Sequence, residues 1–110
     1  TYSNALKMEL LNVAPTTLEK HGAVSAETVH EMLSGLLKNL NVDVGIAISG
    51  IAGPSGGTKN KPVGTVWIAV GNNAEIKTYL INVSKNRQEN IKYSANKALG
   101  LLWKFVRDHY

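Results

Sequence analysis

Apolar side chains recur at intervals of three and four residues in several stretches of the chain, which is the spacing of one face of a helix. The clearest stretch follows Ser25, a residue type that caps helices, and Glu27 and Lys38 lie at the ends that the helix dipole favours. Its apolar positions are Val29, Met32, Leu33, Leu36, Leu37 and Leu40. The pattern predicts a helix that covers a hydrophobic core.

The same criteria predict three more helices. One over residues 4–11 has Ser3 as its cap, and a short one over 15–20 starts with proline and ends at Gly22. A long helix is expected from Asn86 onward. Its apolar face comprises Ile91, Ala95, Ala98, Leu99, Leu102, Phe105 and Val106.

Three stretches rich in β-branched residues lie between the helices and predict strands. They span 42–48, which Ser49-Gly50 ends, 63–70 and 76–83. Gly71-Asn72-Asn73 between the last two is typical of a hairpin turn, so these strands should be antiparallel neighbours. Helices followed by strands and a further helix predict an α/β fold in which helices cover the sheet.

The composition narrows the class of protein. The chain has 110 residues, the length of one domain, and it contains no cysteine. It therefore has neither a disulfide scaffold nor a thiolate metal site, which favours a reducing compartment and a cytoplasmic location. No apolar stretch approaches the ~18 residues of a membrane span, so no membrane partner is expected. The net charge of +4 is spread along the chain, which indicates a solvated helix face rather than a nucleic-acid surface.

The stretch from Ser49 to Gly64 is the strongest candidate for a site. It holds five glycines in sixteen residues and follows a buried strand, where α/β sheets commonly bind ligands. Glycines let a backbone approach a ligand, and Lys59 and Lys61 can neutralise an anion. Two prolines and the exit into a core strand argue against a flexible surface loop. The order of residues matches neither a P-loop nor a GxGxxG motif. A small-molecule site of another kind is therefore predicted.

Other candidates are weaker. Ser3 and Lys7 are four residues apart, so a helix would place them on one face, where a neutral lysine can serve as base to a serine. From spacing alone, a capping serine and a solvated lysine are the better interpretation. His30 begins a stretch similar to a zinc-protease helix, but Ser34 stands where the second histidine is needed, so no metal site is expected. Trp67 and Trp103 are interpreted as core residues.

Several of these stretches occur together in a known family. They are Thr1-Tyr2-Ser3-Asn4-Ala5-Leu6-Lys7, His21-Gly22-Ala23-Val24-Ser25, Ser49-Gly50-Ile51-Ala52-Gly53-Pro54, Gly56-Gly57-Thr58 and Lys61-Pro62-Val63-Gly64-Thr65-Val66. In this order they closely resemble the C-terminal domain of CinA, the competence/damage-inducible protein family, which also occurs as stand-alone PncC enzymes.

The resemblance implies a function and a fold. Members deamidate nicotinamide mononucleotide to nicotinate mononucleotide and ammonia, in pyridine-nucleotide salvage, by a serine–lysine mechanism without metal or cofactor. The implied fold is three-layer α/β/α with a mixed sheet. Lys7 falls on the catalytic lysine and Tyr2 on its supporting tyrosine. Ser49 stands where the family usually has threonine, and as a third catalytic residue its hydroxyl group is expected to face the oxyanion. The implied substrate-binding residues are Ala23, Val24, Ser25, Gly50, Gly53, Gly56, Gly57, Lys61 and, as a weaker match, Arg87.

One departure affects the functional interpretation. The family's nucleophilic serine lies in an Ala-Glu-Ser-Cys-Thr-Gly-Gly type of motif well upstream of the position of Tyr2, and no such motif occurs here. Residues 1–110 are therefore expected to form a single CinA C-terminal-like domain that is truncated at its N-terminus, without its first strands and first helix. Two interpretations stay open: an amidase whose serine lies upstream, and a non-catalytic nucleotide-binding or assembly module. The expected partner is a small-molecule nucleotide, and an exposed sheet edge is compatible with a homo-oligomer.

Overall fold

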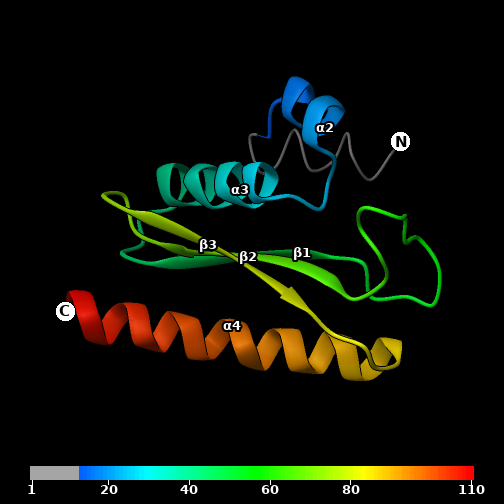
Figure 1. Cartoon of the computed structure of the whole chain (residues 1–110). Coiled ribbons are helices and arrows are strands. Elements are labelled where there is room, and N and C mark those ends of the chain that lie inside the picture. Colours follow the sequence, from blue (N-terminus) through cyan, green and yellow to red (C-terminus); the bar gives the residue numbers. More distant parts are fainter. Residues whose placement is uncertain (1–12) are drawn as a thin grey trace.

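The computed structural model describes residues 13–110, which form three layers. Helices α2 (Pro15–His21) and α3 (Ala26–Asn39) lie on one face of a sheet, and α4 (Arg87–His109) lies on the other (Figure 1). The sheet consists of β1 (Gly45–Gly50), β2 (Thr65–Gly71) and β3 (Ile76–Asn82). The predicted α/β/α architecture is confirmed. The helix expected over 4–11 lies outside the described residues.

The sheet has the order β1-β2-β3, and both pairings are antiparallel. The predicted hairpin between β2 and β3 is confirmed, and its turn is held by Asn72, whose Oδ1 accepts the N–H groups of Ala74 and Glu75 at 2.9 Å. A mixed sheet was expected, whereas the pairs among the described strands are all antiparallel.

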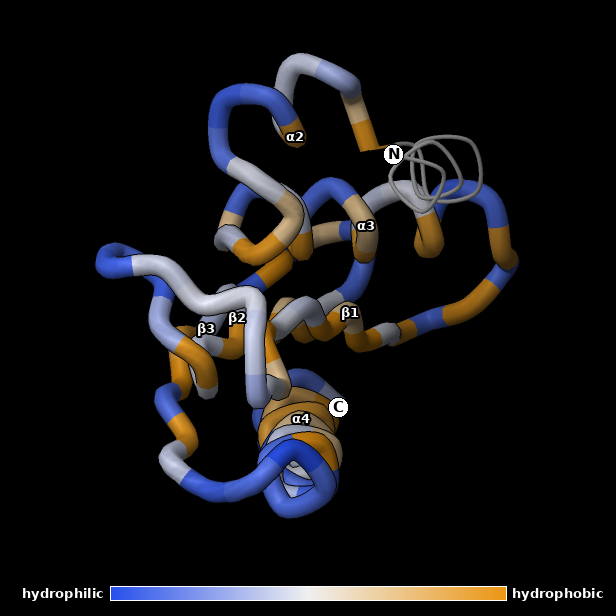
Figure 2. Tube along the Cα trace, turned by 90° about the vertical axis from the view of Figure 1, so that its right-hand side faces the viewer, coloured by the Kyte–Doolittle hydropathy of each residue, from blue (hydrophilic) through white to orange (hydrophobic). Residues whose placement is uncertain are grey.

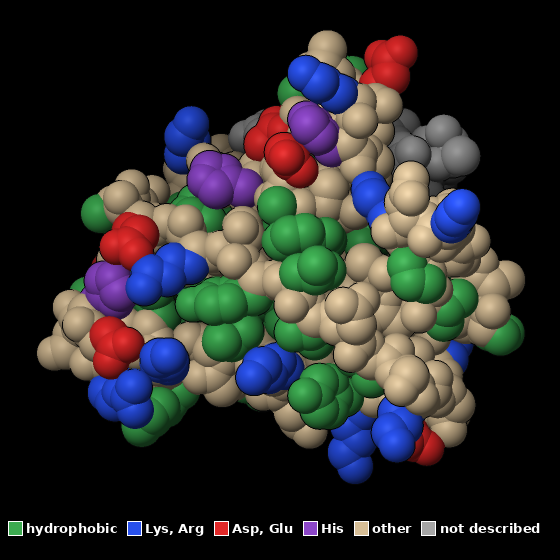
Figure 3. All heavy atoms as spheres, in the orientation of Figure 1, with side chains coloured by type: hydrophobic (Ala, Val, Ile, Leu, Met, Phe, Trp, Pro, Cys, Tyr) green, Lys and Arg blue, Asp and Glu red, His purple; other side chains and the backbone are tan. Residues whose placement is uncertain are grey.

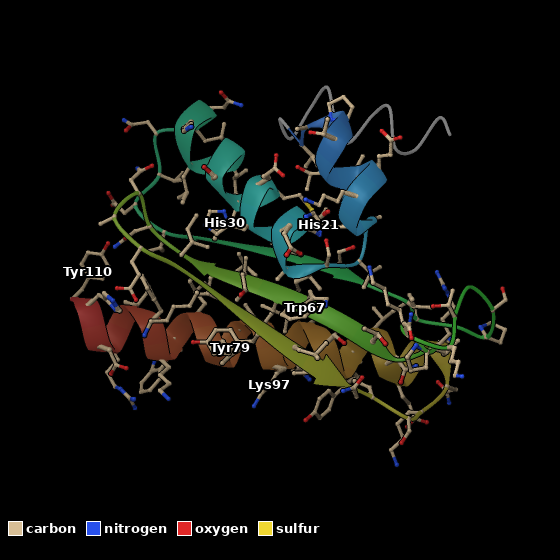
Figure 4. All side chains as sticks on the ribbon, turned by 45° about the horizontal axis from the view of Figure 1, so that its top comes forward. His21, His30, Trp67, Tyr79, Lys97 and Tyr110 are labelled. Atoms are coloured by element: carbon tan, nitrogen blue, oxygen red, sulfur yellow. The ribbon has the colours of Figure 1, made fainter. Side chains whose placement is uncertain are left out.

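The central strand β2 is buried on both faces because its side chains alternate between the two helical layers. Val66, Ile68 and Val70 pack with α4, whereas Ala69 and Trp67 pack with α3. Figure 4 shows Trp67 on the sheet beneath α3, so its interpretation as a core residue is confirmed. The same interpretation of Trp103 is wrong: it is 64% exposed.

The local signals around α3 are confirmed. Ser25 Oγ accepts the Thr28 N–H at 3.1 Å, as an N-cap residue does, and Gly22 ends α2 with φ of +81°. Leu40, however, is the C-cap residue and is 51% exposed. Its prediction as a core residue is wrong because it lies beyond the last turn that faces the sheet.

The ends of two strands differ from the prediction. Ser49 and Gly50 do not end the first strand but belong to it, because they pair with Trp67 and Val66. That strand starts only at Gly45, after residues 42–44. The second strand starts at Thr65 rather than at 63, since Gly64 has a positive φ of +94° in the turn before it.

The face of α4 that contacts the sheet is only partly the predicted one. Ala98 and Phe105 are buried, and Leu102 packs against the same cluster. The line that faces the sheet also includes the polar residues Asn90 and Ser94. The other predicted core positions, Ile91, Ala95, Leu99 and Val106, are exposed and are named the apolar flank below. Figure 2 shows α4 nearly end-on, with apolar residues over more of its circumference than the sheet covers.

Two surface properties bear on the possible partners. Basic side chains on the face shown in Figure 3 are spread over the surface, with several along α4, rather than gathered in one patch. Among residues 13–110, no helix combines the length and the apolar character that crossing a membrane requires.

Candidate functional site

Four segments that are far apart in the sequence meet at one end of the sheet. They are the turn 22–25 between α2 and α3, the end of β1, the loop 51–64 and the start of α4. The loop projects from the sheet at the end where α4 begins (Figure 1). These segments are held together by hydrogen bonds between residues that are 26 to 40 positions apart in the sequence.

Ser49 faces the α2–α3 layer because it lies opposite Trp67 in the antiparallel ladder, and opposed residues share one face of a sheet. It is 7% exposed, and its Oγ donates to the Ala23 carbonyl oxygen at 2.7 Å. This bond uses the hydroxyl hydrogen. In this arrangement Ser49 holds the turn 22–25 against the end of β1, and its two lone pairs stay available as acceptors.

The turn 22–25 is held by two further hydroxyl groups. Ser25 Oγ and Thr28 Oγ1 both donate to the Gly22 carbonyl oxygen, at 3.1 and 2.6 Å. Ser25 is 5% exposed, so its hydroxyl group serves the turn and the helix cap. Ala23 and Val24 between them are half-buried and form the surface of the turn.

Lys61 joins the loop to the C-terminal end of α2. Its Nζ donates to the His21 carbonyl oxygen at 2.6 Å, where the helix dipole favours a cation. Figure 4 shows His21 at the side of α2 that faces the start of α3. An ammonium group has three hydrogens, so two donors remain for a ligand beside the turn 22–25. Lys59, two residues away, is exposed and contacts no acceptor among the described residues.

Two loop glycines make room for the loop itself. A Cβ on Gly53 would lie 2.6 Å from Val63 Cγ1, and one on Gly57 would lie 2.6 Å from the Val63 backbone nitrogen. Both positions therefore need glycine so that the outgoing and returning limbs can pack together. A ligand was predicted to be the group that approaches these glycines, whereas among the described residues that group is Val63. Gly56, by contrast, is exposed at the tip.

The start of α4 holds the outgoing limb from the other side. Arg87 Nη1 donates to the Gly53 carbonyl oxygen at 3.0 Å, so the predicted substrate-binding arginine contacts the loop backbone. Asn90 was not predicted. Its Nδ2 donates to the Ala52 carbonyl oxygen at 2.9 Å, and its Oδ1 accepts the Lys85 N–H at 3.1 Å. The available signal was a polar residue one turn after the Asn86 cap, in line with the buried side of the helix.

An apolar pocket of about 200 Å³ lies on the α4 side of the same region. Ile48, Val66, Ile91 and Ala95 form most of its lining, and Gly50 and Ala52 border it. Asn90 and Ser94 also line it, and within the described part of the chain the buried Ser94 Oγ has no hydrogen-bond partner. The region thus has a polar side toward α2 and α3 and an apolar side toward α4.

The structure therefore brings together Ala23, Ser25, Ser49 and Lys61 on the polar side, while Arg87 lies on the opposite side of the loop. Tyr2 and Lys7 lie outside the described residues. Their roles as the supporting tyrosine and the catalytic base stay predictions.

Residues 1–106 match the sequence model of the CinA C-terminal domain. A nicotinamide-nucleotide amidohydrolase PncC from Enterobacter agglomerans is 60% identical over 67 residues, which are 61% of this chain and 41% of that protein. A CinA-like protein from Desulfosudis oleivorans is 48% identical over 103 residues, 93% of this chain. The chain spans only 25% of that relative's length.

Solved structures show the same fold. The competence damage-inducible protein A from Klebsiella pneumoniae superposes with a TM-score of 0.92 at 33% identity, over 97% of this chain and 66% of that one. A competence/damage inducible protein from Agrobacterium tumefaciens has a TM-score of 0.89 at 33% identity, over 94% of this chain and 64% of the other. Each solved relative is therefore longer than the region that this chain matches.

Proposed function

The chain belongs to the CinA C-terminal domain family, and from this membership we propose that it is part of a nicotinamide-nucleotide amidohydrolase. The observation that carries the proposal is its 60% identity to a PncC enzyme over 67 residues. The substrate would be nicotinamide mononucleotide, and the products would be nicotinate mononucleotide and ammonia.

The polar side of the site supports this proposal because it suits an anionic ligand. Lys61 keeps two donors beside the turn 22–25, and these can form charge-assisted hydrogen bonds to a phosphate group. In the proposed reaction an upstream serine attacks the carboxamide carbon while neutral Lys7 takes the serine proton. Lys7 then gives that proton to the leaving ammonia, and water hydrolyses the acyl-enzyme to the carboxylate. Tyr2 would orient the lysine amine.

The test is an assay of two proteins with nicotinamide mononucleotide as substrate. The protein with the family's serine-bearing segment is expected to release one ammonia per nicotinate mononucleotide formed. Residues 1–110 without that segment are expected to release none, because they lack the nucleophile. If both bind the nucleotide in calorimetric titration and neither turns it over, the non-catalytic binding module is the correct interpretation.

Lys61→Ala is expected to reduce the preference for nicotinamide mononucleotide over nicotinamide riboside, which lacks the phosphate. A charge-assisted hydrogen bond contributes about 1.5–3 kcal/mol, so the ratio of the two dissociation constants should shrink by at least about tenfold. Calorimetric titration of both ligands against the parent protein and the variant measures this ratio.

The riboside separates phosphate binding from damage to the turn. Because Lys61 also holds α2, its loss could weaken both ligands equally, which would leave the ratio unchanged and contradict a phosphate contact. Lys59→Ala is the matched control: it removes the same charge two residues away, from a side chain without a partner among residues 13–110. It should leave the ratio close to that of the parent protein.

A further inference from the structure

Asn90 connects α4 to the loop. The role inferred for it below rests on the proposed function for the identity of the ligand. Asn90 is 1% exposed, and both ends of its amide are used. The Lys85 N–H fixes the amide oxygen at 3.1 Å, so the amide nitrogen is oriented at the Ala52 carbonyl oxygen, 2.9 Å away. Asn90 is therefore itself held rigidly by the chain that enters α4.

A fixed Ala52 carbonyl group also fixes the direction of the next N–H group. The 52–53 peptide is trans, and in a planar trans peptide the C=O and the following N–H point in opposite directions. Since the Ala52 oxygen points to α4, the Gly53 N–H points away from α4. Gly53 is buried, and within residues 13–110 its N–H donates to no acceptor. Arg87 fixes the neighbouring carbonyl group at 3.0 Å, so this part of the loop is held at two successive oxygens.

We propose that Asn90 is a positioning residue of the site: by holding the Ala52 carbonyl group, it directs the Gly53 N–H toward the polar side, where it donates to an oxygen of the bound nucleotide. Asn90 itself does not touch the ligand. The role explains why an asparagine occupies a buried position of α4 that an apolar residue could fill. It also explains why Lys85 and Asn90 are joined across the start of the helix.

The experiment uses the protein that carries the family's serine-bearing segment, and two substitutions of similar size. Asn90→Asp keeps the acceptor for the Lys85 N–H but replaces the donor with a carboxylate, which repels the Ala52 oxygen. Asn90→Leu removes both groups. Hydrogen–deuterium exchange should become about tenfold faster in peptides covering 50–64 and stay unchanged in those covering β2 and β3. The kcat for nicotinamide mononucleotide should fall by about 10- to 100-fold, the cost of a small misplacement in a site.

Asn96→Leu is the matched control, because it makes the same substitution further along α4, at an exposed position outside the candidate site. It should change neither loop exchange nor kcat. If the Asn90 variants exchange faster throughout the sheet and keep the parent kcat per folded molecule, Asn90 is only a packing residue and the proposal fails. Faster exchange confined to the loop with unchanged kcat overturns the link between Gly53 and the ligand.

The two proposals fail in distinguishable ways. If the parent protein itself releases no ammonia, the amidase assignment fails. The exchange measurement then still decides whether Asn90 positions the loop, and titration with nicotinamide mononucleotide replaces the kinetic readout. In that titration the Asn90 variants should bind at least about tenfold more weakly than the Asn96→Leu protein. Equal dissociation constants would overturn the proposal.

Discussion

Replacing Gly64 with alanine is expected to lower the free energy of unfolding by about 3 kcal/mol or more, one of the larger effects of a single substitution. Gly64 has a φ of +94°, which costs a residue with a side chain about 1–2 kcal/mol. A Cβ at this position would also overlap the Val83 carbonyl oxygen. The overlap would force apart Gly64 and Val83, whose backbone groups are hydrogen bonded at 2.9 Å, and that bond contributes about a further 1 kcal/mol.

Denaturant unfolding measures the effect, and Gly100→Ala is its control. Gly100 lies within α4, and an added Cβ would meet nothing within 4 Å, so alanine should raise stability by about 0.5–1 kcal/mol through its better helix propensity. The two substitutions add the same methyl group and should shift the unfolding midpoint in opposite directions. Equal midpoints for Gly64→Ala and the parent protein would show that the junction between the loop and β3 is not as tight as described.

The second large effect is on turnover. In the protein that carries the serine-bearing segment, Lys7→Ala is expected to lower kcat by at least about 10²-fold, the low end of what a general base contributes. The melting temperature should barely change, because a neutral lysine used as a base contributes little to folding. Lys7→Arg should be as inactive as the alanine variant, since a guanidinium group does not give up its proton near neutral pH.

Ammonia release under saturating nicotinamide mononucleotide measures the loss, with the melting temperature of each variant recorded alongside. Lys20→Ala is the control: it removes an exposed lysine from the end of α2 and should keep the parent kcat. Near-normal turnover by Lys7→Ala, or a loss that parallels unfolding, would show that another group removes the proton from the serine.

The helices and the hairpin could be predicted because their signals are local. Ser25 and Asn86 accept backbone N–H groups three residues ahead, and Gly22 ends its helix with a positive φ, so each boundary depends on a few neighbouring residues. The end of β1 could not be predicted in this way. Ser49 and Gly50 are strand residues because of their partners on β2, and the register of a ladder is a property of both strands.

The face of α4 shows a second limit of sequence patterns. Periodicity gave a wide apolar stripe, but it contained no information on how far the helix is rotated against the sheet. The buried side of α4 runs along the line of Asn90, Ser94, Ala98 and Phe105. The apolar flank, which belongs to the predicted stripe, is therefore exposed.

For the site, composition was sufficient to find the loop but not the roles of its residues. Glycine content predicted that the backbone approaches a ligand, whereas the neighbour of Gly53 and Gly57 among the described residues is Val63 of the loop itself. Asn90 and Lys61 act on carbonyl groups 38 and 40 positions away in the sequence. Such contacts depend on the tertiary fold, and no local motif encodes them.

The outer edge of β1 has a practical consequence for work with these 110 residues. Within the described sheet, β1 pairs only with β2, and the sequence of β1 contains none of the lysines or prolines that commonly protect edge strands from misassembly. The apolar flank of α4 contributes Ile91 and Ala95 to the pocket beside Ile48 of the same strand. A strand edge that pairs with no other described strand, next to an apolar surface, is a template for aggregation. We therefore expect solutions of this chain by itself to lose colloidal stability as their concentration rises.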